Sequence, residues 1–300
     1  MNRANDIAIR RRRTLIRTLT PYLWIAPALL IMVALLAVPM IESLKTSFST
    51  GNINGPNDFV GFKNYAKLFR QPEFMVSLWN SLRFTICSVA LQMLIGLIGA
   101  LALNSIKLIK NIFRSVALIP MMLTPVIVAL TWRLFWDTDF GVFNSLLSSI
   151  GLSKIGWLAN PGTAFWAVVV TDVWQNAPYV TMMLLAGLQG MPIDCMEAAT
   201  IDGASAWHKF QRITLPLLKP MILLCLIIRT LFAFRVFEPV YILTNGGPNN
   251  ATLQLSIYVF RLGFRYFQTG MASALSWVML MLCMMITLLY IRILGKEDDQ

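Results

Sequence analysis

Residues 197–216 read EAATIDGASAWHKFQRITLP, a polar segment in a chain of 300 residues that is 57% hydrophobic. It holds small residues, two acids and a Trp-His-Lys cluster, and long apolar stretches flank it on both sides. A plain connection between packed helices needs only a few residues, whereas the whole loop covers residues 191–216. The segment therefore indicates a structured element between two apolar runs.

The composition is that of a membrane protein. Only 13% of the residues are charged, against about 25% in soluble domains, and the mean hydropathy is +0.66. The net charge of +11 does not indicate nucleic-acid binding, because no basic, aromatic-interleaved surface remains outside the apolar runs. The four cysteines show no CxxC spacing and the only histidine is His208, so neither a disulfide framework nor a metal site is predicted.

Six apolar runs are long enough to cross a bilayer, which takes about 20 residues. They cover about 22–42, 78–103, 114–136, 164–188, 219–243 and 271–293. The first run follows Arg10–Arg13 as a secretory signal would, but it is long for a signal core and no small-x-small cleavage site follows it. We predict an all-α integral membrane protein with one transmembrane domain over residues 1–300.

The distribution of lysine and arginine predicts the orientation of these spans. If the N-terminus lies inside, the cytoplasmic segments hold fourteen of these residues and the outer loops hold seven. Both termini are therefore expected in the cytoplasm, and the loop 191–216 becomes a cytoplasmic loop between spans 4 and 5. On the outer side, the stretch GFKNYAKLFRQPEF (61–74) predicts a short amphipathic helix on the membrane surface.

The loop 191–216 predicts two short helices separated by a glycine. Asp194 is a candidate N-cap, with Glu197 three residues later in the arrangement of a capping box. Gly203 is a natural stop for the first helix, because glycine accepts the left-handed conformation at a helix end. Ser205 can cap a second helix that runs to Arg212, before the fifth span begins. We expect this helix–glycine–helix loop, called the elbow below, to lie flat at the cytoplasmic surface.

One face of the elbow is suited to docking. Ala198, Ala199 and Ala204 are small, so another protein backbone can approach closely there. Glu197 and Asp202 offer acceptors to a basic partner. The alternative is an amphipathic surface helix that has no partner.

The same residues carry a family motif. The motif is EAA, three residues, glycine, nine residues and then I-x-LP, and here it reads Glu197-Ala198-Ala199, Gly203 and Ile213-Thr214-Leu215-Pro216. By this motif the chain resembles the membrane subunits, or permeases, of binding-protein-dependent ABC importers. Further resemblance lies in PYLWIAPALL (21–30), GFKNYAKLF (61–69), WQNAPYVTMMLLAGLQGMP (174–192) and YILTNGGPNNAT (241–252). The NGGP stretch is typical of one of the two paired subunits in sugar importers of the maltose and glycerol-phosphate type.

The resemblance implies that the elbow is a coupling helix, which docks in a cleft of an ATP-binding subunit. Glu197 then meets a basic or backbone partner, and Asp202 matches the acid that usually precedes the glycine. Ala198, Ala199 and Gly203 permit the close approach. The resemblance also implies the partners and the location: a second, related permease subunit, two copies of the ATP-binding subunit and a soluble solute-binding protein, in the bacterial cytoplasmic (inner) membrane.

The chain itself is not expected to hydrolyse ATP. It contains no GxxxxGK[ST] motif, and its only Gly-Lys pair is Gly295-Lys296. We therefore expect ATP and Mg²⁺ to be used by the partner subunits, no cofactor to be bound by this chain, and no enzymatic activity in it.

Polar side chains inside the fourth span mark a candidate substrate path, since polar groups in a bilayer usually face the bundle interior or a cavity. Amides and aromatic rings suit a sugar, because hydroxyls take hydrogen bonds and C–H faces stack on rings. In maltose-importer relatives the matching stretch contributes to the sugar site. The residues to which the resemblance extends this role are Asp172, Gln175, Asn176 and Tyr179. The alternative is that these groups only join neighbouring helices.

Charged residues in the fifth span leave the charge of the substrate open. Arg229 and Arg235, with Glu238, can bind an anionic sugar derivative or a glycerol-phosphate-like solute. Alternatively Arg235 pairs with Glu238 three residues on, and Arg229 meets Asp172 across the bundle.

Two other classes of membrane protein compete with an importer subunit. A secondary transporter needs its own coupling-ion site and usually inverted repeats, and neither is visible in the sequence. A membrane enzyme needs a catalytic constellation, and no Ser/His/Asp set, metal cluster or pair of catalytic carboxylates is visible.

Overall fold

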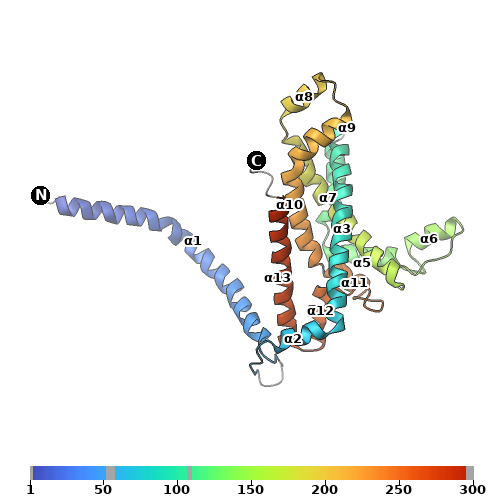
Figure 1. Cartoon of the computed structure of the whole chain (residues 1–300), viewed down its shortest axis with the longest axis horizontal. Helices are drawn as coiled ribbons and strands as arrows, with labels where there is room; N and C mark the ends of the chain where they lie inside the picture. The colour runs from blue at the N-terminus through green and yellow to red at the C-terminus, as the bar shows by residue number, and fades with distance from the viewer. Residues whose placement is uncertain (1–2, 52–57, 107–109, 295–300) are drawn as a thin grey trace.

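The computed structural model describes residues 3–51, 58–106 and 110–294, and these are helical almost throughout (Figure 1). The α-helices are α1 (Arg3–Ser47), α2 (Lys63–Arg70), α3 (Pro72–Ser105), α4 (Lys110–Met122), α5 (Pro125–Phe135), α6 (Val142–Ser149), α7 (Pro161–Gln189), α8 (Ile193–Ile201), α9 (Ala206–Lys209), α10 (Leu215–Phe234), α11 (Glu238–Leu243), α12 (Leu255–Phe260) and α13 (Thr269–Leu294), with π-helical turns η1 (Phe210–Thr214) and η2 (Arg261–Arg265). Within the described ranges, strand-like pairing is limited to an isolated bridge between Ser49 and Phe59. The nearly all-helical prediction is confirmed for these residues.

Four helical stretches in the described ranges are long and apolar enough to cross a membrane. They are Trp24–Ser47, Pro72–Ser105, Ala206–Leu243 and Thr269–Arg292. The bent pair α4 and α5 makes a fifth if it is counted as one span. α7 has 29 residues and is long enough, but its polar residues around Asp172 lower its mean hydropathy, so it is not among these four stretches. A crossing by α7, which makes the sixth span, stays a prediction.

Between residues 114 and 136, where the sequence predicts one span, the structure has two helices. α4 and α5 are bent by 97° relative to each other. Pro120 lies inside α4, and Pro125 occupies the first turn of α5. Thr124 precedes Pro125 and is extended, with ψ of 135°, because a proline disfavours the helical conformation of the residue before it. The prolines thus explain why this apolar run is not one straight helix.

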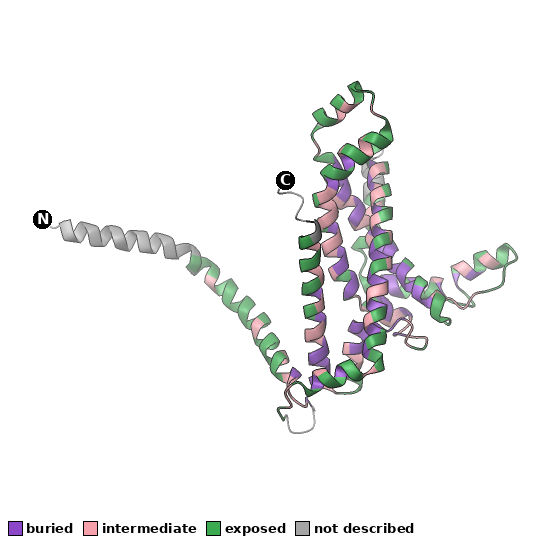
Figure 2. Cartoon of the chain, in the orientation of Figure 1, coloured by how far each residue is buried: buried purple, intermediate pink, exposed green. Residues whose placement is uncertain are grey.

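α3 and α7 form the centre of the bundle, and their contact is the most extensive between any two described helices. Gly96 of α3 permits this close approach, since a Cβ there would lie 2.5 Å from Val180 Cγ1 of α7. Small residues at an interface are a common means of packing helices in membranes. α10 packs against both helices, and the buried residues concentrate along this group (Figure 2).

α1 runs away from the bundle and meets α13 only near its own C-terminal end (Figure 1). No part of its most apolar window is buried, and Leu30 and Leu35 are each 69% exposed. Figure 2 shows the described part of α1 as almost entirely exposed. α1 therefore presents a long apolar surface that the described part of the chain leaves uncovered.

The end of the bundle opposite the elbow is tied together by asparagine side chains. Asn64 of α2, the short helix that the sequence predicted, donates to the carbonyls of Ser47 (2.8 Å) and Ser49 (2.7 Å) at the end of α1. Asn80 of α3 donates to the carbonyls of Asn250 (2.8 Å) and Leu253 (3.1 Å), in and after the NGGP stretch. These bonds fix the loop between α11 and α12 against the start of α3.

Candidate functional site

The elbow, formed by α8, Gly203 and α9, stands at one end of the bundle (Figure 1). α8 is followed by Asp202 as the C-cap and by Gly203 with φ of +71°. The N–H of Gly203 donates to the carbonyl of Thr200 (3.2 Å), and the N–H of Ala204 donates to that of Ala199 (2.9 Å). These two bonds form a Schellman motif, in which glycine occupies the left-handed position. The predicted glycine stop is confirmed.

The two predicted helix caps have different outcomes. Ser205 caps α9, since its Oγ accepts the backbone N–H three residues later at 3.2 Å. Asp194 does not cap α8, because the helix begins two residues earlier than predicted, with Pro192 as the N-cap and no side-chain bond there. The predicted capping box with Glu197 is therefore wrong. Asp194 lies instead in the first turn, where a negative charge favours the helix dipole.

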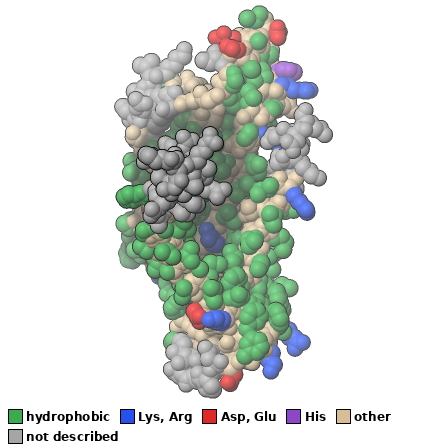
Figure 3. Space-filling model, turned by 90° about the vertical axis from the view of Figure 1, so that its left-hand side faces the viewer, with side chains coloured by type: hydrophobic (Ala, Val, Ile, Leu, Met, Phe, Trp, Pro, Cys, Tyr) green, Lys and Arg blue, Asp and Glu red, His purple; other side chains and the backbone are tan. Residues whose placement is uncertain are grey.

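The residues predicted to dock are accessible. Glu197, Ala198, Asp202 and Gly203 are exposed, and Ala199 and Ala204 are partly exposed. Ile201 and Trp207 also face outward and are 86% and 68% exposed. Figure 3 shows acidic side chains at this end, close to a histidine and to basic side chains. Exposed aromatic and aliphatic groups with a polar rim are typical of a protein-binding surface.

The second helix of the elbow is continuous with the fifth predicted span. The sequence placed its end at Arg212, whereas α9 passes through η1 directly into α10. The stretch Ala206–Leu243 counts as one candidate span of 38 residues. The second helix of the elbow is therefore the beginning of the helical stretch that includes α10.

A cavity of about 410 Å³ lies where α7, α10, α11 and the start of α5 meet. Its lining residues are Pro125, Asp172, Gln175, Asn176, Arg229, Phe232, Arg235, Val236, Glu238 and Pro239. Four of the five predicted pathway residues thus line one cavity, namely Asp172, Gln175, Asn176 and Arg229. The fifth, Tyr179, is not among the lining residues and packs against the apolar cluster around Leu184 and Leu218.

Asp172 is 4% exposed, and both of its carboxylate oxygens accept hydrogen bonds. Oδ2 accepts from the hydroxyl of Ser88 and from Gln92 Nε2, the latter at 2.8 Å. Oδ1 accepts from Asn176 Nδ2 at 2.9 Å. Three donors around one buried carboxylate compensate for the water that it loses.

Arg229 is 6% exposed and is joined to Asp172 indirectly. Its Nε donates to Gln92 Oε1 at 2.7 Å, while Gln92 Nε2 donates to Asp172. Among the described residues no direct ion pair links the two charges. The predicted pairing across the bundle is therefore present, with one amide between its members.

Arg235 and Glu238, the other predicted pair, do not form an ion pair. α10 ends at Phe234 and α11 begins at Glu238, so the two side chains do not share a helix face. Arg235 Nε donates instead to the carbonyl of Leu231 at 3.3 Å. Both charged side chains are exposed and line the cavity beside Arg229.

Ser88 and Gln92 were missed by sequence reasoning. They lie four residues apart, hence on one face of α3, inside a run that carries no charge. Both are 0% exposed. Two polar side chains at this spacing in an apolar span are the signal that could have found them.

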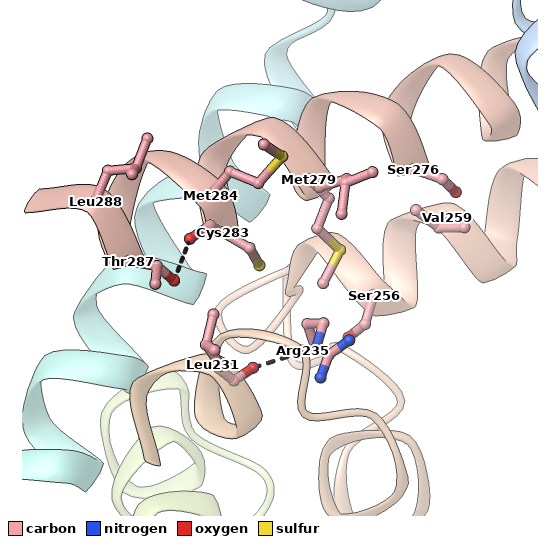
Figure 4. Close-up of a pocket in the computed structure, with 11 residues that line it drawn as sticks. Leu231, Arg235, Ser256, Val259, Ser276, Met279, Cys283, Met284, Thr287 and Leu288 are labelled. Atoms are coloured by element: carbon pink, nitrogen blue, oxygen red, sulfur yellow. Dashed lines mark hydrogen bonds between the residues drawn. The ribbon is translucent and has the colours of Figure 1, made fainter. Parts of the chain in front are cut away.

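A larger hollow of about 700 Å³ lies between α10, α12 and α13 (Figure 4). Met279, Cys283 and Met284 of α13 lie opposite Leu231 of α10 and Arg235, which directly follows α10. The lining is mostly apolar and has few hydrogen-bonding groups. Such a surface suits a lipid chain or an apolar helix better than a sugar.

An elbow on the end of an apolar helical bundle, with a polar cavity inside, defines a membrane translocation protein. Residues 92–296 match the family "Binding-protein-dependent transport system inner membrane component". The chain belongs to this family of ABC transporter permeases, which span the membrane, work with a binding protein and are not enzymes. The resemblance that the EAA motif indicated is confirmed.

Named relatives cover nearly the whole chain. It is 38% identical over 276 residues to the trehalose/maltose transport system permease protein MalF of Thermococcus litoralis, with 91% of this chain and 92% of the relative covered. It is 34% identical over 278 residues to the sulfoquinovosyl glycerol transport system permease protein SmoG of Agrobacterium fabrum (92% and 90% covered). It is 33% identical over 276 residues to the trehalose transport system permease protein SugA of Mycobacterium tuberculosis (91% and 88% covered).

The fold is also that of a solved transporter. A chain from a bacterial ABC transporter involved in the import of the acidic polysaccharide alginate matches with a TM-score of 0.85, at 24% identity, covering 96% of this chain and 99% of that one. A second alginate transporter structure, in complex with its alginate-bound periplasmic protein, matches with a TM-score of 0.83. At this identity the likeness concerns the fold alone.

Proposed function

We propose that the chain is one permease subunit of an ATP-driven sugar importer in the bacterial cytoplasmic membrane. It forms half of an alternating-access pathway for a sugar or sugar derivative that a soluble binding protein delivers. The continuity of the elbow with α10, whose Arg229 lines the polar cavity, is the observation that carries the proposal. A continuous helical stretch thereby leads from α9, the second helix of the elbow, to the proposed pathway.

The proposed topology has six spans with both termini in the cytoplasm. α7 supplies the fourth span and the bent pair α4 and α5 the third. The polar residues of α7 that reduce its hydropathy are those that line the cavity or bond to α3, so they avoid lipid. The excess of lysine and arginine on one side of these spans supports a cytoplasmic position of the elbow.

A separate ATP-binding subunit, present in two copies, supplies the energy. We expect it to receive the elbow in a cleft, with Glu197 and Asp202 toward basic or backbone donors and Ala198, Ala199 and Gly203 at the closest approach. Ile201 and Trp207 add apolar surface to this contact. ATP and Mg²⁺ bind to that subunit, and this chain requires no cofactor.

A second, related permease completes the pathway. The apolar face of α1 and the apolar hollow beside α13 are the surfaces that support such a partner, since neither is covered within the described part of the chain. The cavity at Arg229 includes exposed lining residues, Arg235 and Glu238, which a second subunit would cover.

The proposal that the transported substrate is a sugar is supported by the residues that line the cavity and by the named relatives. Amide groups of Gln175 and Asn176 line the cavity and can bond to hydroxyls. Two of the named relatives transport trehalose or maltose by their names. An anionic sugar derivative or a glycerol-phosphate-like solute is the alternative, favoured by Arg229 and by the sulfoquinovosyl glycerol relative. A secondary transporter has less support, because it would have no use for the elbow.

Reconstitution in proteoliposomes tests the proposed function. The chain is coexpressed with the ATP-binding subunit and second permease from neighbouring genes, purified, and supplied with the binding protein. We expect sugar uptake that requires ATP and falls at least about tenfold in Glu197→Ala, an exposed site with little effect on stability. Failure of the three membrane-complex proteins to copurify, or normal uptake in Glu197→Ala, would contradict the proposal.

A further inference from the structure

The charges around the cavity balance. Arg229 and Arg235 carry two positive charges, and Asp172 and Glu238 carry two negative ones. Arg235 and Glu238 are exposed and lie at the rim of the cavity. Asp172 and Arg229 are 4% and 6% exposed, and their charges dominate the deep wall of the cavity.

Gln92 connects this buried pair in a single orientation. The guanidinium of Arg229 needs an acceptor and the carboxylate of Asp172 needs a donor, and one amide supplies both. Reversing the amide would place its NH₂ against Arg229 and its oxygen against the carboxylate. Gln92 Nε2 also lies 2.8 Å from Ser88 Oγ, which bonds to the same carboxylate. The network therefore holds α3, α7 and α10 together.

The two charged side chains differ in what they leave for a ligand. Both oxygens of Asp172 already accept bonds from Ser88, Gln92 and Asn176. Arg229 is held through Nε, and its side chain lines the cavity. Its terminal amino groups remain able to donate to a ligand oxygen, while its net charge is offset by Asp172.

We propose that Asp172, acting through the Gln92 amide, neutralises Arg229 and so makes this cavity select uncharged sugars over acidic ones. Arg229 then serves as a hydrogen-bond donor to a hydroxyl or ring oxygen, and no anionic group is needed to balance it. Asp172 and Gln92 are specificity-determining residues, although Asp172 is saturated by protein donors. This inference rests on the proposed function and specifies its substrate class.

Removal of the negative charge of Asp172 is expected to invert the preference for neutral over acidic sugars. Asp172→Asn keeps the size of the side chain but leaves Arg229 unbalanced, so an acidic sugar gains a charge-assisted bond. Adding Arg229→Met in the same chain removes the excess charge and restores the preference for neutral sugar. A purely structural role of Asp172 would lower binding of both sugars equally and leave the ratio of their affinities unchanged.

The test uses the assembled transporter without its binding protein, so that the binding protein's own selectivity does not enter. Equilibrium dialysis in nanodiscs measures binding of maltose and of its acidic counterpart, maltobionate. We expect the wild type to favour maltose, Asp172→Asn to shift the ratio of affinities at least about tenfold toward maltobionate, and the double variant to return to the wild-type ratio.

Two results would overturn the inference: a wild type that prefers maltobionate, or a ratio of affinities that stays unchanged in Asp172→Asn. ATP-driven uptake by the wild-type complex with its binding protein is measured in parallel. If uptake occurs and the ratio does not shift, the inference alone fails. If no sugar is taken up at all, the proposed function fails and the inference with it.

Discussion

Gly203 is constrained by backbone conformation and not by space. Its φ of +71° lies in the left-handed region, and a Cβ at this position would meet no atom within 4 Å. A residue that tolerates this conformation should therefore be accepted, whereas one that cannot adopt it should disrupt the turn between α8 and α9.

Two substitutions of Gly203 distinguish a requirement for the left-handed backbone conformation from a requirement for glycine itself. Asn adopts the left-handed conformation at little cost, so Gly203→Asn should retain most ATP-driven uptake. Gly203→Pro fixes φ near −65° and removes the N–H that bonds to the carbonyl of Thr200. We expect the proline variant to insert in the membrane but to lose most uptake, measured in proteoliposomes against membrane abundance. Equal uptake by the two variants would contradict a coupling role for this turn.

The buried residues Asp172 and Arg229 predict a second effect, on the stability of the protein. Arg229→Met leaves the carboxylate of Asp172 in the bundle without its compensating charge. We expect a loss of about 3 kcal/mol in the free energy of unfolding, by analogy with other broken buried pairs. Adding Asp172→Asn should recover much of this loss. Thermal unfolding of the detergent-solubilised protein measures both, and additive losses in the double variant would argue against coupling of the two residues.

At the scale of elements, the approach of α3 to α7 depends on glycine. A Cβ on Gly96 would lie 2.5 Å from Val180 Cγ1 and 3.2 Å from the backbone nitrogen of Thr181. The backbone nitrogen cannot move without shifting α7 itself. The same two helices carry Gln92 and Asp172, so their separation also sets the geometry of the cavity wall.

Gly96→Ala should therefore destabilise the bundle by about 1–3 kcal/mol through overpacking. Gly162→Ala is the matched control, since a Cβ on Gly162 at the start of α7 would meet no atom within 4 Å. We expect the control to be neutral or slightly stabilising, by at most about 1 kcal/mol. Unfolding midpoints that fall by the same amount in both variants would show that the helices do not pack as described.

Elements that depend on near neighbours in the chain could be predicted from the sequence. The glycine stop at Gly203 and the cap at Ser205 each join atoms within a few residues, and α2 follows from a local amphipathic pattern. The bend between α4 and α5 was hidden because its prolines lie in an uninterrupted apolar run. The start of α8 was misplaced by two residues, so the N-cap is Pro192 and not Asp194.

The cavity could be predicted only in part, for a different reason. Polar residues in apolar spans identified four of its lining residues, since burial of such groups requires a partner or water. Gln92 joins residues 80 and 137 positions away, and no local pattern states which helices will face it. Tyr179 shares α7 with the lining residues but is directed toward another cluster, because a helix distributes its side chains around its axis.

At the scale of the whole molecule, the uncovered apolar surface of α1 is not explained by contacts within one chain. Its apolar window is exposed throughout, although the remaining helices bury part of theirs. Contact with α13 is confined to one end (Figure 1). An importer with two permeases gives this helix a second subunit to pack against.

A photocrosslinking amino acid at Leu35, which is 69% exposed, tests this assignment. In the assembled complex we expect a crosslink to the second permease, visible as a band of the combined mass. The same group at Leu275 of α13, which is 0% exposed, is the control and should give only crosslinks within the chain. If Leu35 yields no crosslink to another protein, α1 faces lipid and the pairing surface lies elsewhere.

The central claim is that the elbow is the cytoplasmic surface that receives the ATP-binding subunit. Cys195 of α8 is exposed, and a variant that lacks Cys87, Cys225 and Cys283 reports on it alone. Ser149→Cys, at the exposed end of α6, is the control in the same background, since the proposed topology puts the loop 137–163 on the outer side.

Labelling of Cys195 with a membrane-impermeant maleimide is the most direct measurement. We expect Cys195 to be labelled in inverted vesicles and not in right-side-out vesicles. A cysteine at Ser149 should be labelled in right-side-out vesicles only. Binding of the ATP-binding subunit should strongly protect Cys195 from labelling. Labelling of Cys195 from the outer face, or at the same rate with and without that subunit, would contradict the central claim.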